Sequence, residues 1–193
     1  MSSRRKFRCS SVPVTTRVEK LSHDGRGLAR IDGKATFIEG ALAGELVTFE
    51  RRLKKRDFDE GRVLSIEEPS VNRVEPRCAH HGVCGGCSLQ HLNPDIQIDE
   101  KEKLVLDLLM RIAHLEPKHV APALSTLNIW HYRNRARLSV SWVEKKGRVL
   151  IGFREKHNGR YVADIKQCSI LHEKVGTSLD TLSKLLESMD DPR

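Results

Sequence analysis

The chain has 193 residues, of which 38% are hydrophobic and 31% charged, and its formal net charge is +8. Its apolar residues cluster in periodic segments, which excludes disorder throughout, and no stretch approaches the roughly 20 apolar residues that a membrane span needs. A chain this basic favours nucleic acid as a partner, with an anionic membrane surface second. The basic residues 1–11 are predicted to be a disordered arm. No apolar stretch follows them, so we expect no secretory signal and a cytoplasmic protein.

Residues 12–68 are predicted to form a small closed barrel of the OB type. Short segments rich in Val, Ile, Phe and Thr alternate with turn dipeptides such as Asp32-Gly33. The five predicted strands cover residues 12–21, 27–31, 35–38, 45–51 and 62–66. The intervals between them leave no room for a helix, and closure would remove the exposed edges of so small a sheet.

Residues 69–193 are predicted to form a second, α+β domain. After a cysteine-rich loop, residues 94–115 have helical periodicity, with Asn93 as a suitable N-cap and Pro94 as a suitable first residue. Residues 130–143 alternate as a strand does, with 148–154 as the partner strand and 161–165 as a third. A last helix is predicted between residues 172 and 189. The predicted fold class is therefore mainly β with an α+β second domain.

Four cysteines form the strongest chemical signal. They are Cys78, Cys84 and Cys87 in one loop, and Cys168 far downstream. We expect Gly85 and Gly86 to make the loop turn easily through positive φ, and Cys168 to be the fourth ligand if the sheet returns the chain to the loop. Four thiolates suit either zinc or a [4Fe-4S] cluster, and buried free thiols are the third alternative.

The residues alone leave the choice between zinc and cluster open. Zinc knuckles usually have two CxxC pairs, which Cys168 cannot supply, but histidines near the loop also suit zinc. These histidines are His80, His81 and His91. The fifth cysteine, Cys9, lies in the basic arm without a partner, and we interpret it as incidental.

Two groups of basic residues are candidates for RNA contacts. The first, in a predicted loop between two barrel strands, comprises Arg51, Arg52, Lys54, Lys55 and Arg56. These residues either contact phosphate or form a solvated hairpin tip. The second comprises Arg133, Arg135 and Arg137 on one face of a predicted strand. They either bind phosphate or pair with acidic residues, for which Glu144, Glu155 and Asp164 are available.

Aromatic side chains near both groups could stack on unpaired bases. In the barrel these are Phe37, Phe49 and Phe58, each of which could equally belong to the core. Near the predicted strand they are Trp130, His131, Tyr132 and Trp142. Of these four, Trp142 is expected to be buried.

Residues 76–91, with the sequence PRCAHHGVCGGCSLQH, resemble the cluster loop of bacterial 23S ribosomal RNA uracil-5-methyltransferases. Residues 132–139 resemble a strand of the central domain of that family, and residues 151–154 and 162–168 resemble the segments that come after this strand in the family. Residues 12–68 are similar to its N-terminal TRAM domain. The TRAM barrel ahead of the cluster favours the type that modifies the U1939 region of 23S RNA.

The resemblance implies a [4Fe-4S] cluster on the four cysteines and binding of 23S ribosomal RNA by the barrel and the central domain. It also implies that the intact enzymes transfer a methyl group from S-adenosylmethionine, in a further domain that this chain lacks. We therefore assign no catalytic or S-adenosylmethionine-binding residue and expect a monomer without methyltransferase activity. The alternative is a stand-alone RNA-binding or redox-sensing module.

Overall fold

The computed structural model describes residues 12–125 and 128–189, so the predicted arm, residues 1–11, and Cys9 lie outside the described residues. Contacts between Cα atoms divide the chain into two compact units. The first comprises Met1–Glu75 and His91–Ala123, and the second comprises Pro76–Gln90 and Leu124–Arg193. The loop that carries three of the cysteines therefore belongs to the same unit as Cys168.

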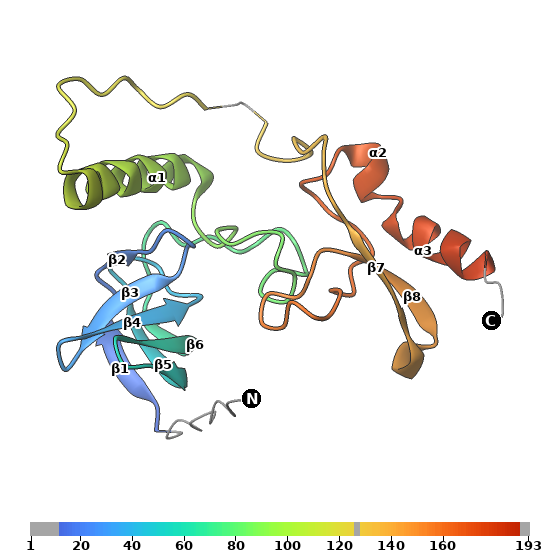
Figure 1. The fold of residues 1–193 in the computed structure, drawn as a ribbon, viewed down its shortest axis with the longest axis horizontal. Coiled ribbons are helices and arrows are strands. Elements are labelled where there is room, and N and C mark those ends of the chain that lie inside the picture. Colours follow the sequence, from blue (N-terminus) through green and yellow to red (C-terminus); the bar gives the residue numbers. More distant parts are fainter. Residues whose placement is uncertain (1–11, 126–127, 190–193) are drawn as a thin grey trace. The chain divides into compact units, whose positions relative to one another are not determined.

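The first unit contains a six-stranded sheet with the order β1-β5-β6-β4-β3-β2 (Figure 1). The strands are β1 (Val14–Arg17), β2 (Lys20–Leu21), β3 (Gly27–Ile31), β4 (Lys34–Glu39), β5 (Leu46–Lys54) and β6 (Phe58–Glu68). Neighbouring strands are antiparallel except β4 and β6, which are parallel. Four of the five expected strands are confirmed at these positions, and β3 has the predicted bounds.

The expected first strand is split into β1 and β2, so the expectation of five strands was wrong. At the break, the Val18 N–H donates to the Glu45 carbonyl oxygen at 2.9 Å, whereas the Glu19 N–H donates to the Leu28 carbonyl oxygen at 2.8 Å. Val18 itself is 1% exposed and points into the core. The segment therefore changes its hydrogen-bonding partner from β5 to β3 within two residues. The two end strands of the sheet are consecutive in the chain.

The core of the first unit lies on one face of this sheet. Its buried members are Val18, Ala29, Ile38, Ala41, Val47 and Phe49. The ring of Phe49 fills the space beside Gly61, where a Cβ atom would lie 2.4 Å from Phe49 Cδ2. A glycine is therefore required at this position of β6 because the ring approaches the backbone closely.

The helix expected over residues 94–115 is confirmed in its first part as α1 (Pro94–Leu108), which a π-helical turn, η1 (Leu109–Ala113), continues. The Asn93 side chain accepts a hydrogen bond from the Asp95 N–H at 3.1 Å, as the predicted N-cap requires. The chain leaves the helix at His114, which has a φ of 53°. Neither α1 nor η1 contains a buried residue.

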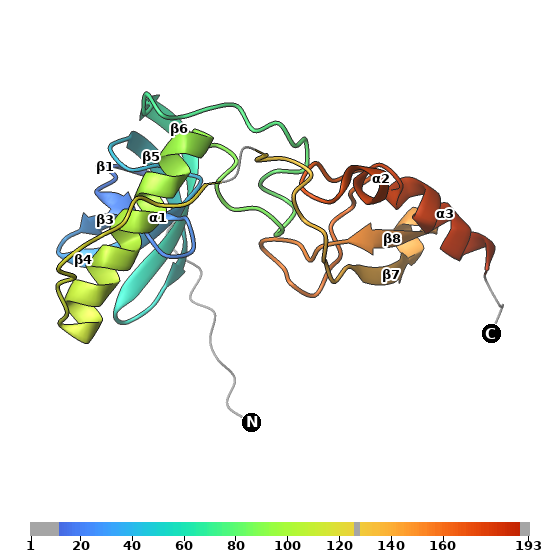
Figure 2. The same cartoon turned by 90° about the horizontal axis from the view of Figure 1, so that it is seen from above.

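The second unit has a two-stranded sheet and two helices. They are β7 (Ser139–Val143), β8 (Arg148–Gly152), α2 (Glu173–Gly176) and α3 (Leu179–Ser188), and a 3-10 turn, η2 (Glu144–Lys146), joins the strands. Helix α3 packs along β8 (Figure 2). The expected strand over 130–143 starts only at Ser139, and the expected third strand is reduced to an isolated bridge between Arg154 and Val162.

Trp142 is 55% exposed, so the prediction that it is buried was wrong. It lies opposite Val149 in the β7–β8 pair, and opposite residues of antiparallel strands share one face of the sheet. Val149 is covered within the core of the second unit, to which α3 contributes Leu179. Because α3 packs on β8, the same face remains open at β7. Within the described ranges, no helix is both long and apolar enough to cross a membrane.

Candidate functional site

The second unit contains a hollow lined by all four candidate cysteines. Cys78, Cys84 and Cys87 reach it from the loop before α1, and Cys168 reaches it from the segment between β8 and α2. The space free of protein atoms is about 340 Å³, including the part open to solvent. All four side chains are half-buried free thiols. The structure thus brings together the four residues that the sequence indicated.

Backbone hydrogen bonds fasten the cysteine loop to the chain that follows β8. The Gly85 N–H donates to the Arg154 carbonyl oxygen at 2.9 Å, and the Lys156 N–H donates to the Val83 carbonyl oxygen at 2.8 Å. An isolated antiparallel bridge joins Cys84 and Glu155 between them. These bonds hold Cys84 against the core of the second unit, where Cys168 also packs.

Two glycines permit this close approach. A Cβ atom on Gly85 would lie 2.8 Å from the Arg154 carbonyl oxygen, and one on Gly86 would lie 2.8 Å from Phe153 Cδ2. The positive φ that we expected at these two positions is found instead at Gly82, at 85°. Gly85 and Gly86 are therefore needed for the packing of the loop against its neighbours.

Cys168 is positioned by the end of α2. Its N–H donates to the Gly176 carbonyl oxygen at 3.0 Å. A Cβ atom on Gly176 would lie 2.2 Å from the Cys168 carbonyl oxygen, so only glycine allows this contact. The fourth cysteine thus depends on a second glycine contact, which lies far from the loop in sequence.

Hydrogen-bond donors contact the sulfur atoms of Cys84 and Cys87. The Gly86 N–H donates to Cys84 Sγ at 3.4 Å. Gln90 lines the hollow, accepts from the Cys78 N–H at 3.2 Å and interacts with the Cys87 thiol. Hydrogen bonds to sulfur stabilise thiolates and tune the potentials of metal clusters. Gln90 was not predicted as a site residue, although its place three residues after Cys87 was a usable signal.

The thiols oppose one another's ionisation. Burial raises the pKa of Cys84, and the proximity of the other three cysteines raises this pKa further, against the Gly86 hydrogen bond. Burial likewise raises the pKa of Cys87, although Gln90 and Arg133 act in the other direction. Four thiolates in this hollow therefore require a compensating positive charge.

The histidines considered as zinc ligands are divided. His80 and His81 line the hollow, whereas His91 belongs to the first unit and is only 4% exposed. Over residues 12–125 and 128–189, no three His, Cys, Asp or Glu side chains are arranged to hold a single metal ion. The four thiols around one hollow are therefore the feature that defines the site.

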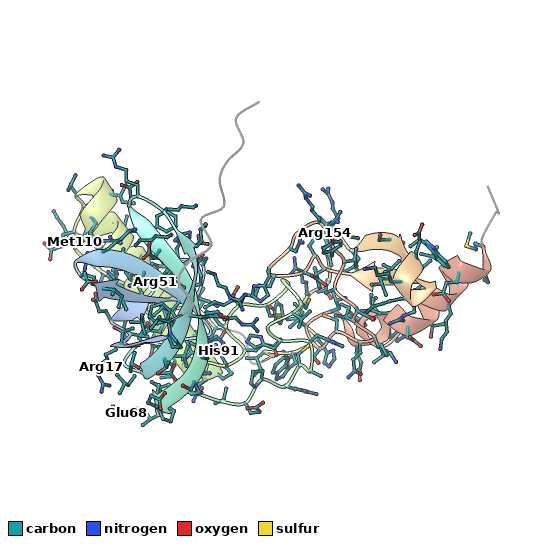
Figure 3. The ribbon with its side chains drawn as sticks, turned by 90° about the horizontal axis from the view of Figure 1, so that it is seen from below. Arg17, Arg51, Glu68, His91, Met110 and Arg154 are labelled. Atoms are coloured by element: carbon teal, nitrogen blue, oxygen red, sulfur yellow. The ribbon has the colours of Figure 1, made fainter. Side chains whose placement is uncertain are left out.

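The basic run of the first unit lies at the end of β5 and in the turn to β6. Arg51, labelled in Figure 3, is 3.5 Å from the Asp59 carboxylate, and Arg52 pairs with Glu50. Arg56 is 96% exposed at its side chain and 3.9 Å from Asp57. The other two members are Lys54 and Lys55, both exposed. Lys54, Lys55 and Arg56 therefore present the most accessible charge of this run.

The three arginines of the second unit do not share a strand, because β7 begins after them. Arg133 is half-buried, and its guanidinium lies 5.3 Å from the centre of the Phe153 ring. Arg135 and Arg137 are exposed. Of the acidic residues suggested as partners, Asp164 instead pairs with Lys146 and Arg148.

Phe49 is a core residue with 0% exposure, whereas Phe37 and Phe58 are half-buried. These three phenylalanines of the first unit, considered together in the sequence, thus have two different environments.

A family model described as "TRAM domain" matches residues 13–49. A 23S rRNA (uracil(1939)-C(5))-methyltransferase of Legionella pneumophila is 53% identical over 177 residues, which are 92% of this chain and 40% of that protein. The Francisella tularensis protein of the same name is 46% identical over 89% of this chain and 38% of its own length. The chain therefore spans about two fifths of the length of the curated relatives that it matches.

A solved structure supports the fold. The Pyrococcus abyssi tRNA (uracil-54, C5)-methyltransferase, in complex with S-adenosyl-L-homocysteine, matches with a TM-score of 0.61 at 24% identity, over 91% of this chain and 37% of that chain. Together, these matches show that the chain carries a TRAM domain and is, over most of its length, a homologue of part of the 23S rRNA (uracil(1939)-C(5))-methyltransferases.

Proposed function

We propose that this chain is the RNA-binding and iron–sulfur portion of a 23S rRNA uracil-5-methyltransferase. The observation that carries the proposal is the hollow lined by Cys78, Cys84, Cys87 and Cys168, in a chain homologous to part of such enzymes. The relatives are named for methylation of uracil 1939. We propose 23S ribosomal RNA in the cytoplasm as the partner of this chain.

The donor set fits a [4Fe-4S] cluster. Four thiols line one hollow, a backbone N–H donates to one sulfur, and the thiols need positive charge to ionise together. When bound, a cluster supplies iron that neutralises the thiolates. The residues themselves link two segments distant in sequence, the loop and the chain around Cys168. We therefore propose a structural role, in which loss of the cluster loosens the second unit.

The RNA-binding portion is proposed to be a closed OB-like barrel over residues 12–68, followed by the iron–sulfur portion over 69–193. Closure is supported by the change of partner at Val18 and Glu19, because β1 pairs with β5 and β2 pairs with β3. OB barrels bind single-stranded nucleic acid on one face. The proposed phosphate contacts come from Lys54, Lys55 and Arg56 in the barrel, and from Arg135 and Arg137 in the second unit.

Methyl transfer from S-adenosylmethionine is proposed for the intact enzyme. In this division of roles, these 193 residues bind the RNA and hold the metal centre. We therefore expect the purified chain to bind RNA without transferring a methyl group. Methylation of a 23S RNA fragment by this chain alone, followed with radiolabelled S-adenosylmethionine, would show that this division of roles is wrong.

The decisive experiment is anaerobic purification followed by a visible absorption spectrum and by iron and sulfide analysis. A brown protein with about four irons and four sulfides per chain is the expected result. A colourless protein with about one zinc per chain would leave a basic RNA-binding protein and contradict the iron–sulfur assignment.

A further inference from the structure

A row of two adjacent aromatic rings with one cation at each end lies on the first unit. The Arg26 guanidinium carbon is 4.8 Å from the centre of the Phe37 ring, and Phe37 meets Phe58 edge to face with centroids 5.5 Å apart. Lys55 Nζ is 4.6 Å from the centre of the Phe58 ring. The row thus runs from the residue before β3 to the turn after β5.

The two rings lie on the outer face of the sheet. In β4, Phe37 stands between Thr36 and Ile38, which are both fully buried. Phe58 precedes Asp59, which is 3% exposed. Because successive side chains of a strand point to opposite faces, both phenylalanines point away from the core. They therefore offer ring surface outside the barrel.

The two ends of the row differ in charge. Arg26 is held by Asp24 at 2.8 Å and faces Glu60 at 3.5 Å, so its charge is already balanced. Lys55 has no ion pair within the described part of the chain and follows Lys54, which also has none. Arg26 thus fixes one end of the row, whereas Lys55 leaves an uncompensated charge at the other.

OB barrels bind their ligands on the second and third strands and on the adjoining loops. If β1 and β2 are counted as one broken strand, β3 and β4 are the second and third strands. The row includes Arg26 from the loop before β3 and Lys55 from the turn between β5 and β6. It therefore lies where this architecture places a ligand.

We propose that unpaired RNA bases stack on Phe37 and Phe58, with the adjacent phosphate on Lys55. This inference rests on the proposed RNA binding and names the residues that recognise the unpaired strand. A nucleotide offers the flat π-face of its base to the rings and its phosphate to the lysine, so one unpaired strand can contact both. The remaining exposure of the half-buried rings is what a base would cover.

The test uses the full chain, purified anaerobically, and a fluorescein-labelled single-stranded RNA whose binding is followed by anisotropy. Phe37→Leu and Phe58→Leu remove the ring and keep an apolar side chain, whereas Phe37→Tyr and Phe58→Tyr keep the ring. The leucine variants are expected to bind roughly five- to hundredfold more weakly, the range measured for the loss of one stacked base. The tyrosine variants are expected to bind as the unaltered chain does. Far-UV circular dichroism checks that all four fold.

A second RNA distinguishes stacking from phosphate contact. In an oligonucleotide with abasic sites, the difference between the leucine variants and the unaltered chain is expected to disappear, because the bases are gone. If the unaltered chain binds the normal RNA and the folded leucine variants bind it equally well, the stacking inference is wrong and the proposed RNA binding stands. If the unaltered chain does not bind RNA, both proposals fail. Equal loss with leucine and tyrosine would also overturn the stacking inference.

Discussion

The guanidinium of Arg73 donates hydrogen bonds to both carboxylate oxygens of Glu45. Its Nε donates to Oε1 at 2.6 Å and its Nη2 donates to Oε2 at 2.8 Å, and the Glu45 side chain is completely buried. The same carboxylate accepts from the Leu42 N–H at 2.8 Å and the Ser70 N–H at 3.1 Å. Arg73 also donates to the Gly40 carbonyl oxygen at 2.7 Å. One buried carboxylate thus joins the chain after β6 to the loop before β5.

Removal of Arg73 should strongly destabilise the first unit. Arg73→Ala leaves Glu45 as a buried charge without its cation, which costs about 3 kcal/mol of unfolding free energy. The measurement is urea denaturation followed by far-UV circular dichroism, because Trp130 and Trp142, the two tryptophans of the chain, both lie in the second unit. Arg17→Ala is the control, since Arg17 and Glu68 form a pair with side chains 57% and 59% exposed. Equal destabilisation by both variants would contradict this prediction.

Glu45 should also make the stability of the first unit pH-dependent. Burial by itself raises the pKa of Glu45, but the hydrogen bonds from Arg73, Leu42 and Ser70 outweigh it and lower the pKa below 4.5. A group with a lowered pKa in the folded state stabilises above its unfolded pKa and loses this contribution as the pH falls through the folded pKa. The unfolding free energy should therefore fall as the pH drops below about 5 and through the lowered pKa of Glu45.

The control for this pH dependence is Glu45→Gln, which cannot ionise at that position. Its unfolding free energy should be lower at neutral pH and should fall less steeply with acid than that of the unaltered chain. Parallel pH profiles for the two proteins, measured by urea denaturation, would show that Glu45 is not the group responsible.

Local sequence patterns predicted the strands of the first unit well. Features that depend on residues distant in the sequence were not predicted. The bounds of β3 followed from a short segment of strand-forming residues that ends at the Asp32-Gly33 turn, where both residues have positive φ. The break at Val18 and Glu19 depends on carbonyl oxygens of Glu45 and Leu28, which no local pattern reveals. The exposure of Trp142 likewise depends on where α3 packs.

In the candidate site, too, local patterns were predictive and long-range contacts were not. The cysteine spacing and the resemblance indicated four residues that do meet at one hollow. The reason for Gly85 and Gly86 was predicted wrongly, because the backbone of Arg154 and the ring of Phe153 come from another part of the chain. The shared strand face of Arg133, Arg135 and Arg137 was also wrong, because a periodic sequence does not guarantee a pairing partner.

Each proposed cysteine ligand should be necessary for the metal centre. Cys168→Ser replaces a thiolate by a weak ligand, and we expect iron and sulfide per chain to fall to less than about half. Cys9→Ser is the matched control, because Cys9 has no role in the proposed site, and its metal content should be unchanged. Iron and sulfide analysis after anaerobic purification gives both values. Full metal content in Cys168→Ser would exclude Cys168 as a ligand.

Close packing at Gly85 should contribute to the stability of the second unit and to its metal content. In Gly85→Ala, the new methyl group would meet the Arg154 carbonyl oxygen at 2.8 Å, and backbone cannot move aside as a flexible side chain can. We expect a loss of about 1–3 kcal/mol of unfolding free energy and a lower iron content. Gly159→Ala is the control, because nothing lies within 4 Å of its Cβ position. Intrinsic tryptophan fluorescence during urea denaturation reports on the second unit. Unchanged stability in Gly85→Ala would refute the packing argument.

Exposed and half-buried arginines of the second unit should behave differently. Arg135→Gln and Arg137→Gln remove exposed charges, so each should weaken RNA binding and reduce the slope of log K against log salt concentration by about 0.7. Arg133→Gln also removes the contact with Phe153 and the hydrogen bond from Nε to the Arg135 carbonyl oxygen at 3.2 Å, so we expect it to lower stability as well. Lys101→Gln, an exposed charge on α1, is the control for a general change of net charge. Anisotropy titrations at several salt concentrations measure the slopes. The same small change in all four variants would mean that RNA senses only the net charge of the chain, because a specific phosphate contact must separate Arg135 and Arg137 from Lys101.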